Sequence, residues 1–117
     1  MTGYENLDVW RESMALVTKI YNLLQSFPND ERFALSDQIR RSAVSIPSNI
    51  AEGSTRNSRK EFIQFLYIAL GSVCELETQL MIARNVGYIK ELTSILDHTT
   101  RIKKMLNGLI SSLKRSL

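Results

Sequence analysis

The stretch that decides the fold is "SRKEFIQFLYIALGSVCELETQLMIARN", residues 58–85. It opens with Ser58 and, three residues later, Glu61. This pair is a capping box, in which each residue satisfies a free backbone donor of the other. Apolar residues then recur every three or four positions: Phe62, Leu66, Ala69, Val73, Leu76, Leu80 and Ala83. This spacing marks one face of an α-helix, so we predict a helix over residues 58–85 that stops at Gly87.

Further apolar residues lie on other sides of the same helix. A second stripe holds Ile63, Tyr67, Leu70, Cys74 and Met81, and a third side holds Phe65 and Ile68. A helix that is apolar nearly all round needs burial on more than one side. A bundle of this length buries one stripe of each helix, and exposed apolar patches often mark interfaces. We therefore expect a homo-oligomer with a candidate interface of Phe65, Tyr67, Ile68 and Met81. The alternative is that this helix is the central one of an asymmetric bundle.

Two other helices have clear apolar stripes. The helix over residues 7–25 carries Leu7, Trp10, Met14, Val17, Tyr21 and Leu24, and it ends before Pro28. The helix over residues 91–115 carries Leu92, Ile95, Thr99, Ile102, Leu106, Leu109 and Leu113. The chain has only five glycines and two prolines, which argues against an all-β fold.

The remaining helix, over residues 36–53, contains Pro47. Apolar residues keep the helical spacing across this proline: Leu35, Ile39, Ala43, Ile46 and Ile50. An interior proline removes a backbone hydrogen bond and clashes with the preceding turn. We predict one helix kinked near Pro47, with two short helices as the alternative. Ser48, Asn49 and Glu52 are expected to satisfy the carbonyl that the proline leaves without a donor.

Short connections make sequential helices antiparallel neighbours. The expected fold is all-α: an up-down-up-down four-helix bundle formed by residues 1–117 as a single domain.

The residue types offer little catalytic or metal-binding chemistry. The one histidine, His98, follows Ile95 by three positions, which excludes the Glu-x-x-His pattern of di-iron bundles. We interpret His98 as a solvated helix residue and Cys74 as a small hydrophobic residue. The glycines are isolated and form no phosphate loop. We therefore expect no enzymatic activity, no metal and no cofactor.

The same sequence indicates the compartment. Residues 1–8 lack the basic-then-apolar order of a signal peptide, and the longest uncharged run, residues 62–74, is too short to span a bilayer. A single cysteine excludes an internal disulfide. These features predict a cytoplasmic protein without a membrane partner.

Charge is the remaining functional signal. The net charge is +3, and residues 101–117 carry five basic residues and no acidic one. The candidate nucleic-acid-binding residues are Arg40, Arg41, Arg56, Arg59, Lys60, Lys103, Lys104, Lys114 and Arg115. In an up-down bundle, the start of the third helix and the end of the fourth lie at the same end. We therefore expect a basic rim that binds RNA or DNA backbones, with an ordinary solvated surface as the alternative. The aromatic-basic alternation of single-strand binding modules is not visible along the chain.

Several segments together resemble one family. They include "LDVWRESMALVTKIY", "ERFALSDQIRRSAVSIPSNIAEG", "SRKEFIQFLYIALGSVCELETQL" and "KKMLNGLISSLK", and they cover nearly the whole chain. The chain resembles the four-helix-bundle proteins encoded in intervening sequences of bacterial 23S ribosomal RNA genes. The resemblance implies assembly into a ring, usually a pentamer. It also implies kinship with the accessory protein of diversity-generating retroelements, which binds nucleic acid and a reverse transcriptase. An alternative function is therefore a protein-interaction scaffold or accessory subunit, for example for a reverse transcriptase.

Overall fold

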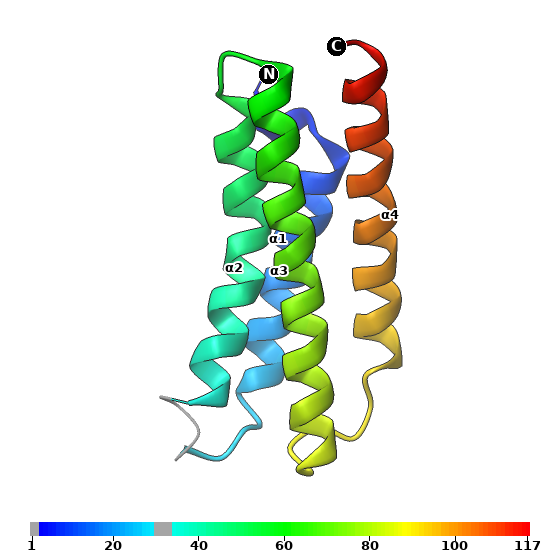
Figure 1. Ribbon diagram of the computed structural model, residues 1–117. Helices are drawn as coiled ribbons and strands as arrows, with labels where there is room; N and C mark the ends of the chain where they lie inside the picture. Colours follow the sequence, from blue (N-terminus) through cyan, green and yellow to red (C-terminus); the bar gives the residue numbers. More distant parts are fainter. Residues whose placement is uncertain (1–2, 30–33) are drawn as a thin grey trace.

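The computed structural model describes residues 3–29 and 34–117. It contains a short 3-10 helix, η1 (Tyr4–Asn6), and four α-helices: α1 (Asp8–Leu24), α2 (Leu35–Ser54), α3 (Arg59–Asn85) and α4 (Thr93–Arg115). Sequential helices run in opposite directions in an elongated bundle measuring 46 × 22 × 22 Å (Figure 1). The predicted all-α four-helix bundle is confirmed.

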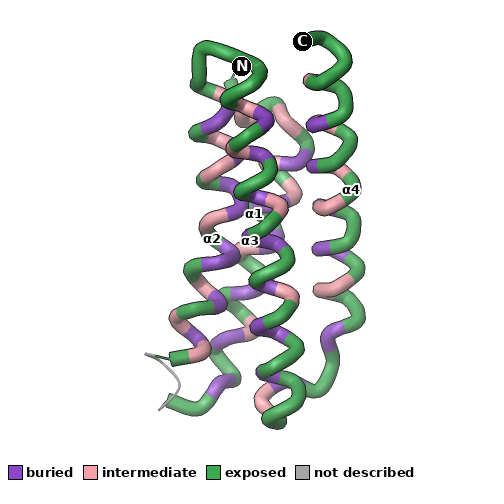
Figure 2. Tube along the Cα trace, viewed as in Figure 1, coloured by how far each residue is buried: buried purple, intermediate pink, exposed green. Residues whose placement is uncertain are grey.

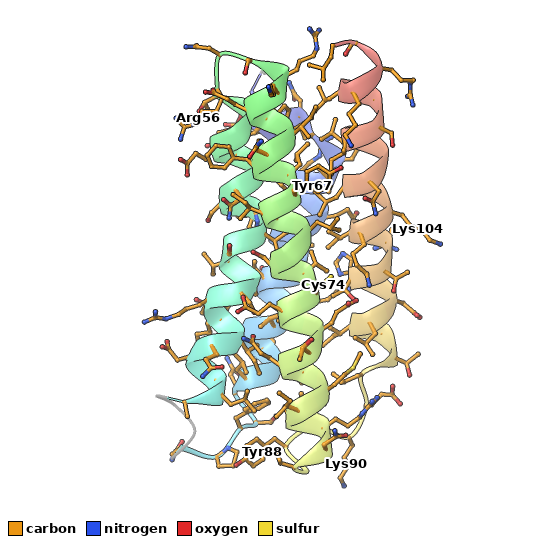
Figure 3. The ribbon with its side chains drawn as sticks, viewed as in Figure 1. Arg56, Tyr67, Cys74, Tyr88, Lys90 and Lys104 are labelled. Carbon is orange, nitrogen blue, oxygen red and sulfur yellow. The ribbon has the colours of Figure 1, made fainter. Side chains whose placement is uncertain are left out.

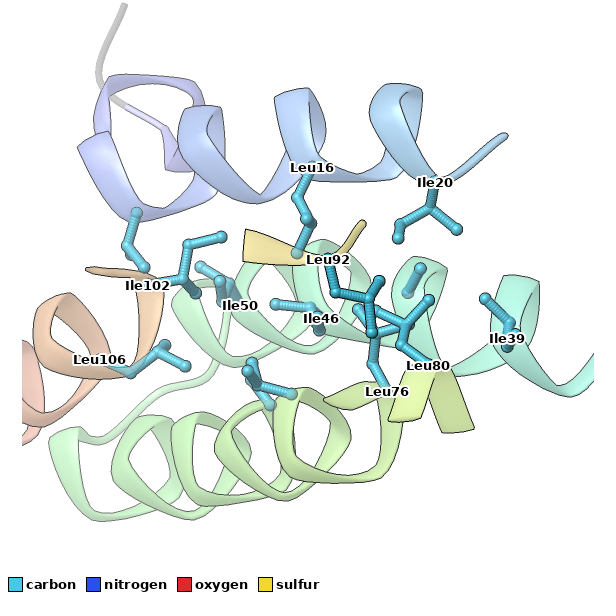
Figure 4. Close-up of a cluster of buried hydrophobic side chains, with 14 of the residues drawn as sticks. Leu16, Ile20, Ile39, Ile46, Ile50, Leu76, Leu80, Leu92, Ile102 and Leu106 are labelled. Carbon is cyan, nitrogen blue, oxygen red and sulfur yellow. The ribbon is translucent and has the colours of Figure 1, made fainter. Parts of the chain in front are cut away.

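The core lies along the bundle axis, where buried positions of the four helices face one another (Figure 2). The α2 stripe of Ile39, Ala43, Ile46 and Ile50 is fully buried (Figure 4). The main α3 stripe is also buried, apart from the half-buried Phe62. Each large apolar side chain buried in this way contributes about 1.5–3 kcal/mol relative to exposure. By length and composition α3 alone among the described helices is apolar enough to cross a membrane, but a core helix of a soluble protein passes the same test.

The predicted stripe of α1 is wrong at two of its six positions. Leu24 is buried, and Leu7, Trp10 and Val17 are partly buried against the core. Met14 and Tyr21 are exposed, whereas the buried positions are Val9, Ser13, Leu16, Ile20 and Leu24. Both stripes have helical spacing, and the serine in the true one weakened its apolar pattern. The Ser13 hydroxyl is satisfied inside the core because it donates to the Val9 carbonyl at 2.7 Å. Only packing against the other helices selects between the two faces.

Helix α2 continues through Pro47 as a single α-helix. Proline lacks the N–H that would bond the carbonyl four residues earlier, that of Ala43. We expected Ser48, Asn49 and Glu52 to satisfy this carbonyl, and the expectation is wrong for Asn49 and Glu52. The Asn49 side chain donates to the Ser45 carbonyl at 2.8 Å, and Glu52 pairs with Arg56. The kink at Pro47 stays a prediction.

Both ends of α3 follow the sequence signals. The Ser58 hydroxyl accepts a hydrogen bond from the Glu61 backbone N–H at 3.1 Å. At the other end Gly87 has φ +90°, a left-handed conformation that favours glycine. Its N–H donates to the Arg84 carbonyl, and the Tyr88 N–H donates to the Ala83 carbonyl, which completes a Schellman motif.

Small residues bring α2 and α3 close together. A Cβ atom at Gly53 would lie 2.5 Å from the Cβ of Phe65, so only glycine fits there. Further along this contact the Ser42 hydroxyl donates to the Gln79 side chain at 2.8 Å, and Ser45 and Ser72 share a hydrogen bond at 2.8 Å. This approach places Phe65 of α3 beside the last turn of α2.

Candidate nucleic-acid interface

Five basic side chains gather where α2 ends, α3 begins and α4 ends, and Figure 1 shows these three segments at the same end of the bundle. They are Arg56, Arg59, Lys60, Lys114 and Arg115, and all five are exposed. We call these five residues the basic end.

The cations of the basic end differ in their partners. The Arg56 guanidinium pairs with the Glu52 carboxylate at 2.5 Å. The Lys114 ammonium donates to the Tyr67 hydroxyl, not to a carboxylate, at 2.7 Å. Within residues 3–29 and 34–117, Arg59, Lys60 and Arg115 form no ion pair. Four of the five positive charges therefore face solvent without a carboxylate partner among the described residues.

The other candidate basic residues lie elsewhere. Arg40 and Arg41 are on the second turn of α2, at the opposite end of the bundle. Arg41 pairs with Asp37 at 3.1 Å, and the Arg40 guanidinium lies 5.8 Å from the centroid of the Tyr21 ring.

Lys103 and Lys104 lie midway along α4. Lys103 pairs with Glu77 at 2.9 Å, whereas Lys104 projects into solvent away from the bundle (Figure 3). The nine candidate residues thus fall into three separate groups.

The structure also joins basic and aromatic side chains at the basic end. The Arg56 guanidinium lies 4.8 Å from the centroid of the Phe65 ring, and the Lys114 ammonium lies 5.2 Å from that of Tyr67. Figure 3 shows Arg56 and Tyr67 on this half of the molecule. Sequence reasoning missed both pairs because it looked for alternation along the chain. Each pair instead joins residues from two different segments of the bundle.

The candidate interface residues of α3 do not share one environment. Ile68, Tyr67 and Met81 are exposed by 52%, 46% and 39%. Phe65 is half-buried, with Gly53 and Arg56 against it.

Cys74 is exposed rather than the buried hydrophobic residue we expected. Ile82 of α3 and Val86, the residue that follows this helix, are exposed as well. We call Tyr67, Ile68, Cys74, Met81 and Ile82 the outer face of α3.

The interpretation of His98 as a solvated residue is wrong, because its side chain is only 3% exposed. Its Nδ1 lies 3.1 Å from the Lys19 Nζ, and its Nε2 lies 2.8 Å from the Glu12 Oε1. An ammonium group only donates, so Nδ1 accepts from Lys19 and Nε2–H donates to Glu12. Hydrogen bonds from Arg101 and His98 hold the pKa of Glu12 below its ordinary value. Across the described part of the chain, no cluster of three or more potential ligands suits a metal ion.

Fold and surface define a small four-helix-bundle protein with a basic end. The chain belongs to the 23S rRNA-intervening sequence protein family, whose family model matches residues 5–108. It is similar to the crystal structure of a protein of unknown function from the S23 ribosomal protein family of Bacteroides thetaiotaomicron. The two are 35% identical, with a TM-score of 0.80, over 87% of this chain and 97% of that one. No curated protein matches the chain.

Proposed function

We propose that this protein is a non-enzymatic, self-associating bundle that binds RNA or DNA backbones through its basic end, with little sequence specificity. The observation that carries the proposal is a group of four cations that have no carboxylate partner in the described part of the chain: Arg59, Lys60, Lys114 and Arg115. A phosphate backbone releases counterions when such side chains neutralise it, which favours binding at every sequence.

Self-association would multiply this surface. Exposed apolar side chains on the outer face of α3, such as Ile68 and Met81, favour contact with another copy. A ring, usually of five subunits, is what the family resemblance implies. Repeating the basic end around a ring makes binding multivalent, which strengthens it without new kinds of contact. The exposed thiol of Cys74 on this face suits a reducing cytoplasm.

Fluorescence anisotropy with labelled RNA and DNA across a salt series tests the binding. Replacing Arg59 and Lys60 with glutamine should weaken binding to all sequences and reduce the slope of log affinity against log salt by about 2. The matched control replaces Arg84 and Lys90 with glutamine. Arg84 is an exposed cation in the last turn of α3, and Lys90 is an exposed cation shortly after this helix ends. Absence of binding at low salt, or an equal loss in the control, would refute the proposal.

A second candidate function is a scaffold or accessory subunit for another protein, for example a reverse transcriptase. The observation that favours it is the exposed apolar surface of the outer face of α3, since Ile68 is 52% exposed. Ile68→Glu should then abolish capture of a reverse transcriptase by the protein. Light scattering on the same variant separates the loss of a partner from the loss of self-association. Unchanged capture and unchanged mass would exclude this face from both roles.

A further inference from the structure

The Arg56 guanidinium is fixed on two sides. The Glu52 carboxylate, one turn earlier in α2, accepts a hydrogen bond from its Nη2 at 2.5 Å. The Phe65 ring of α3 lies beneath it, 4.8 Å from ring centroid to Cζ. The side chain is still 42% exposed, so the guanidinium keeps access to solvent. A planar cation held in this way is already ordered before any ligand arrives.

This guanidinium borders a surface hollow of about 320 Å³. The hollow is lined by Arg56, Lys60, Glu61, Gln64 and Phe65. Its apolar part is the Phe65 ring. The Gln64 amide and the Glu61 carboxylate supply acceptors, and the amide also supplies donors. Lys60 and its chain neighbour Arg59 supply positive charge for phosphates at the edge of this hollow.

Planar stacking, edge hydrogen bonds and nearby cations together match an unpaired nucleotide. Bases that are free of a duplex stack on arginine planes and on aromatic rings, and their edges are then open to amide and carboxylate groups. Bases inside a duplex are already stacked on both faces, so they offer no free π-face to Arg56. A cation that only binds the backbone needs no such arrangement, because a flexible lysine also binds a phosphate as a point charge.

We propose that Arg56, supported by Glu52 and Phe65, is a stacking platform for an unpaired base, and that the preferred ligand of the basic end is single-stranded nucleic acid. This inference rests on the proposed function, since Arg59 and Lys60 would hold the phosphates on either side of the stacked base. Preorganisation matters here, because the ordering of the Arg56 side chain is complete before binding. Gly53 makes the platform possible, since a side chain at that position would push Phe65 away.

The decisive comparison uses two single strands of about ten nucleotides, one with unstructured pyrimidine bases and one abasic, each with the same number of phosphates. The strand with bases should bind roughly fivefold to a hundredfold more tightly, the range that base stacking on one platform supplies. A duplex with the same total number of phosphates should show no such gain over the abasic strand. Anisotropy titrations at one fixed salt concentration measure all three.

Substitutions test whether the preference for the base-bearing strand depends on Arg56. Arg56→Lys keeps the charge and removes the plane, so it should abolish most of the base preference and leave the salt slope unchanged. Arg84→Lys is the matched control, since Arg84 is an exposed arginine at the far end of α3, and it should change neither. Phe65→Leu keeps an apolar side chain beneath Arg56 and should also lose the preference. Circular dichroism confirms that each variant is folded.

The outcomes separate the two proposals. Equal affinity for the base-bearing and abasic strands would overturn the stacking platform and leave backbone binding standing. No binding to any strand or duplex would overturn both. A full base preference in folded Arg56→Lys and Phe65→Leu would also overturn the assignment to Arg56.

Discussion

Replacing Gly53 with alanine perturbs the closest approach of α2 and α3. The added Cβ would lie 2.5 Å from the Phe65 Cβ and 3.0 Å from the Phe62 Cδ1. A Cβ is attached directly to the backbone, so the Phe65 Cβ cannot rotate away as the end of a long side chain can. The two helices must therefore separate locally, and Phe65 must move relative to Arg56.

Two opposing effects set the size of the change. Overpacking of this kind costs about 1–3 kcal/mol of unfolding free energy. Replacing a helical glycine with alanine raises the unfolding free energy by roughly 0.5–1 kcal/mol. Gly71 and Gly108 separate these effects. Both are exposed helical glycines, and beyond their own stretch of helix nothing in the described structure lies within 4 Å of an added Cβ. We expect Gly71→Ala and Gly108→Ala to stabilise the protein, and Gly53→Ala to be less stable than either by about 1–3 kcal/mol.

Chemical denaturation followed by circular dichroism measures these differences. The denaturant slope should be the same in all three variants, so that the midpoints report stability alone. If Gly53→Ala gained as much stability as Gly71→Ala, the close approach of α2 and α3 would be refuted. The geometry proposed for Arg56 over Phe65 would then lose its support as well.

Three further predictions concern other parts of the bundle. Gly87→Ala should cost about 1 kcal/mol of unfolding free energy, because its φ of +90° strains an L-residue, and thermal melts should show a smaller loss for Gly87→Asn. Glu77→Ala should cost about 1–3 kcal/mol, because its carboxylate accepts from Thr99 at 2.6 Å and Lys103 at 2.9 Å, and a double-mutant cycle with Lys103→Ala should give a smaller combined loss than the sum. The pKa of Glu12 is lowered in the folded state, so its carboxylate stabilises the protein at pH values above the ordinary pKa of glutamate. This contribution is lost as the pH falls through the lowered pKa. Melts across the pH range should therefore show that Glu12→Gln flattens the acid side of the stability profile below about pH 4.

Helix positions were predictable because their signals are local. The capping serine, the apolar spacing and Gly87 all lie within one segment, and the predicted helix 58–85 differs from α3 (Arg59–Asn85) by one residue. The stripe of α2 was equally clear, because its isoleucines leave one apolar face. In α1 two neighbouring faces are both apolar, and spacing alone gave no reason to choose the one that holds Ser13.

The candidate site was less predictable, because its properties depend on distances between helices. A charge count identifies Arg56, Arg59 and Lys60 as basic, but it does not show that Glu52 neutralises only the first of them. The burial of His98 follows from the approach of Lys19 and Glu12 on α1, far away in sequence.

Local physical chemistry therefore accounts for the four helices and their antiparallel order, because backbone hydrogen bonding, capping and apolar spacing act over a few residues. Tertiary packing decided which face of α1 is buried and which cations stay unpaired. It also placed Phe65 beneath Arg56, because side-chain burial and charge pairing act through space between segments that the sequence keeps apart.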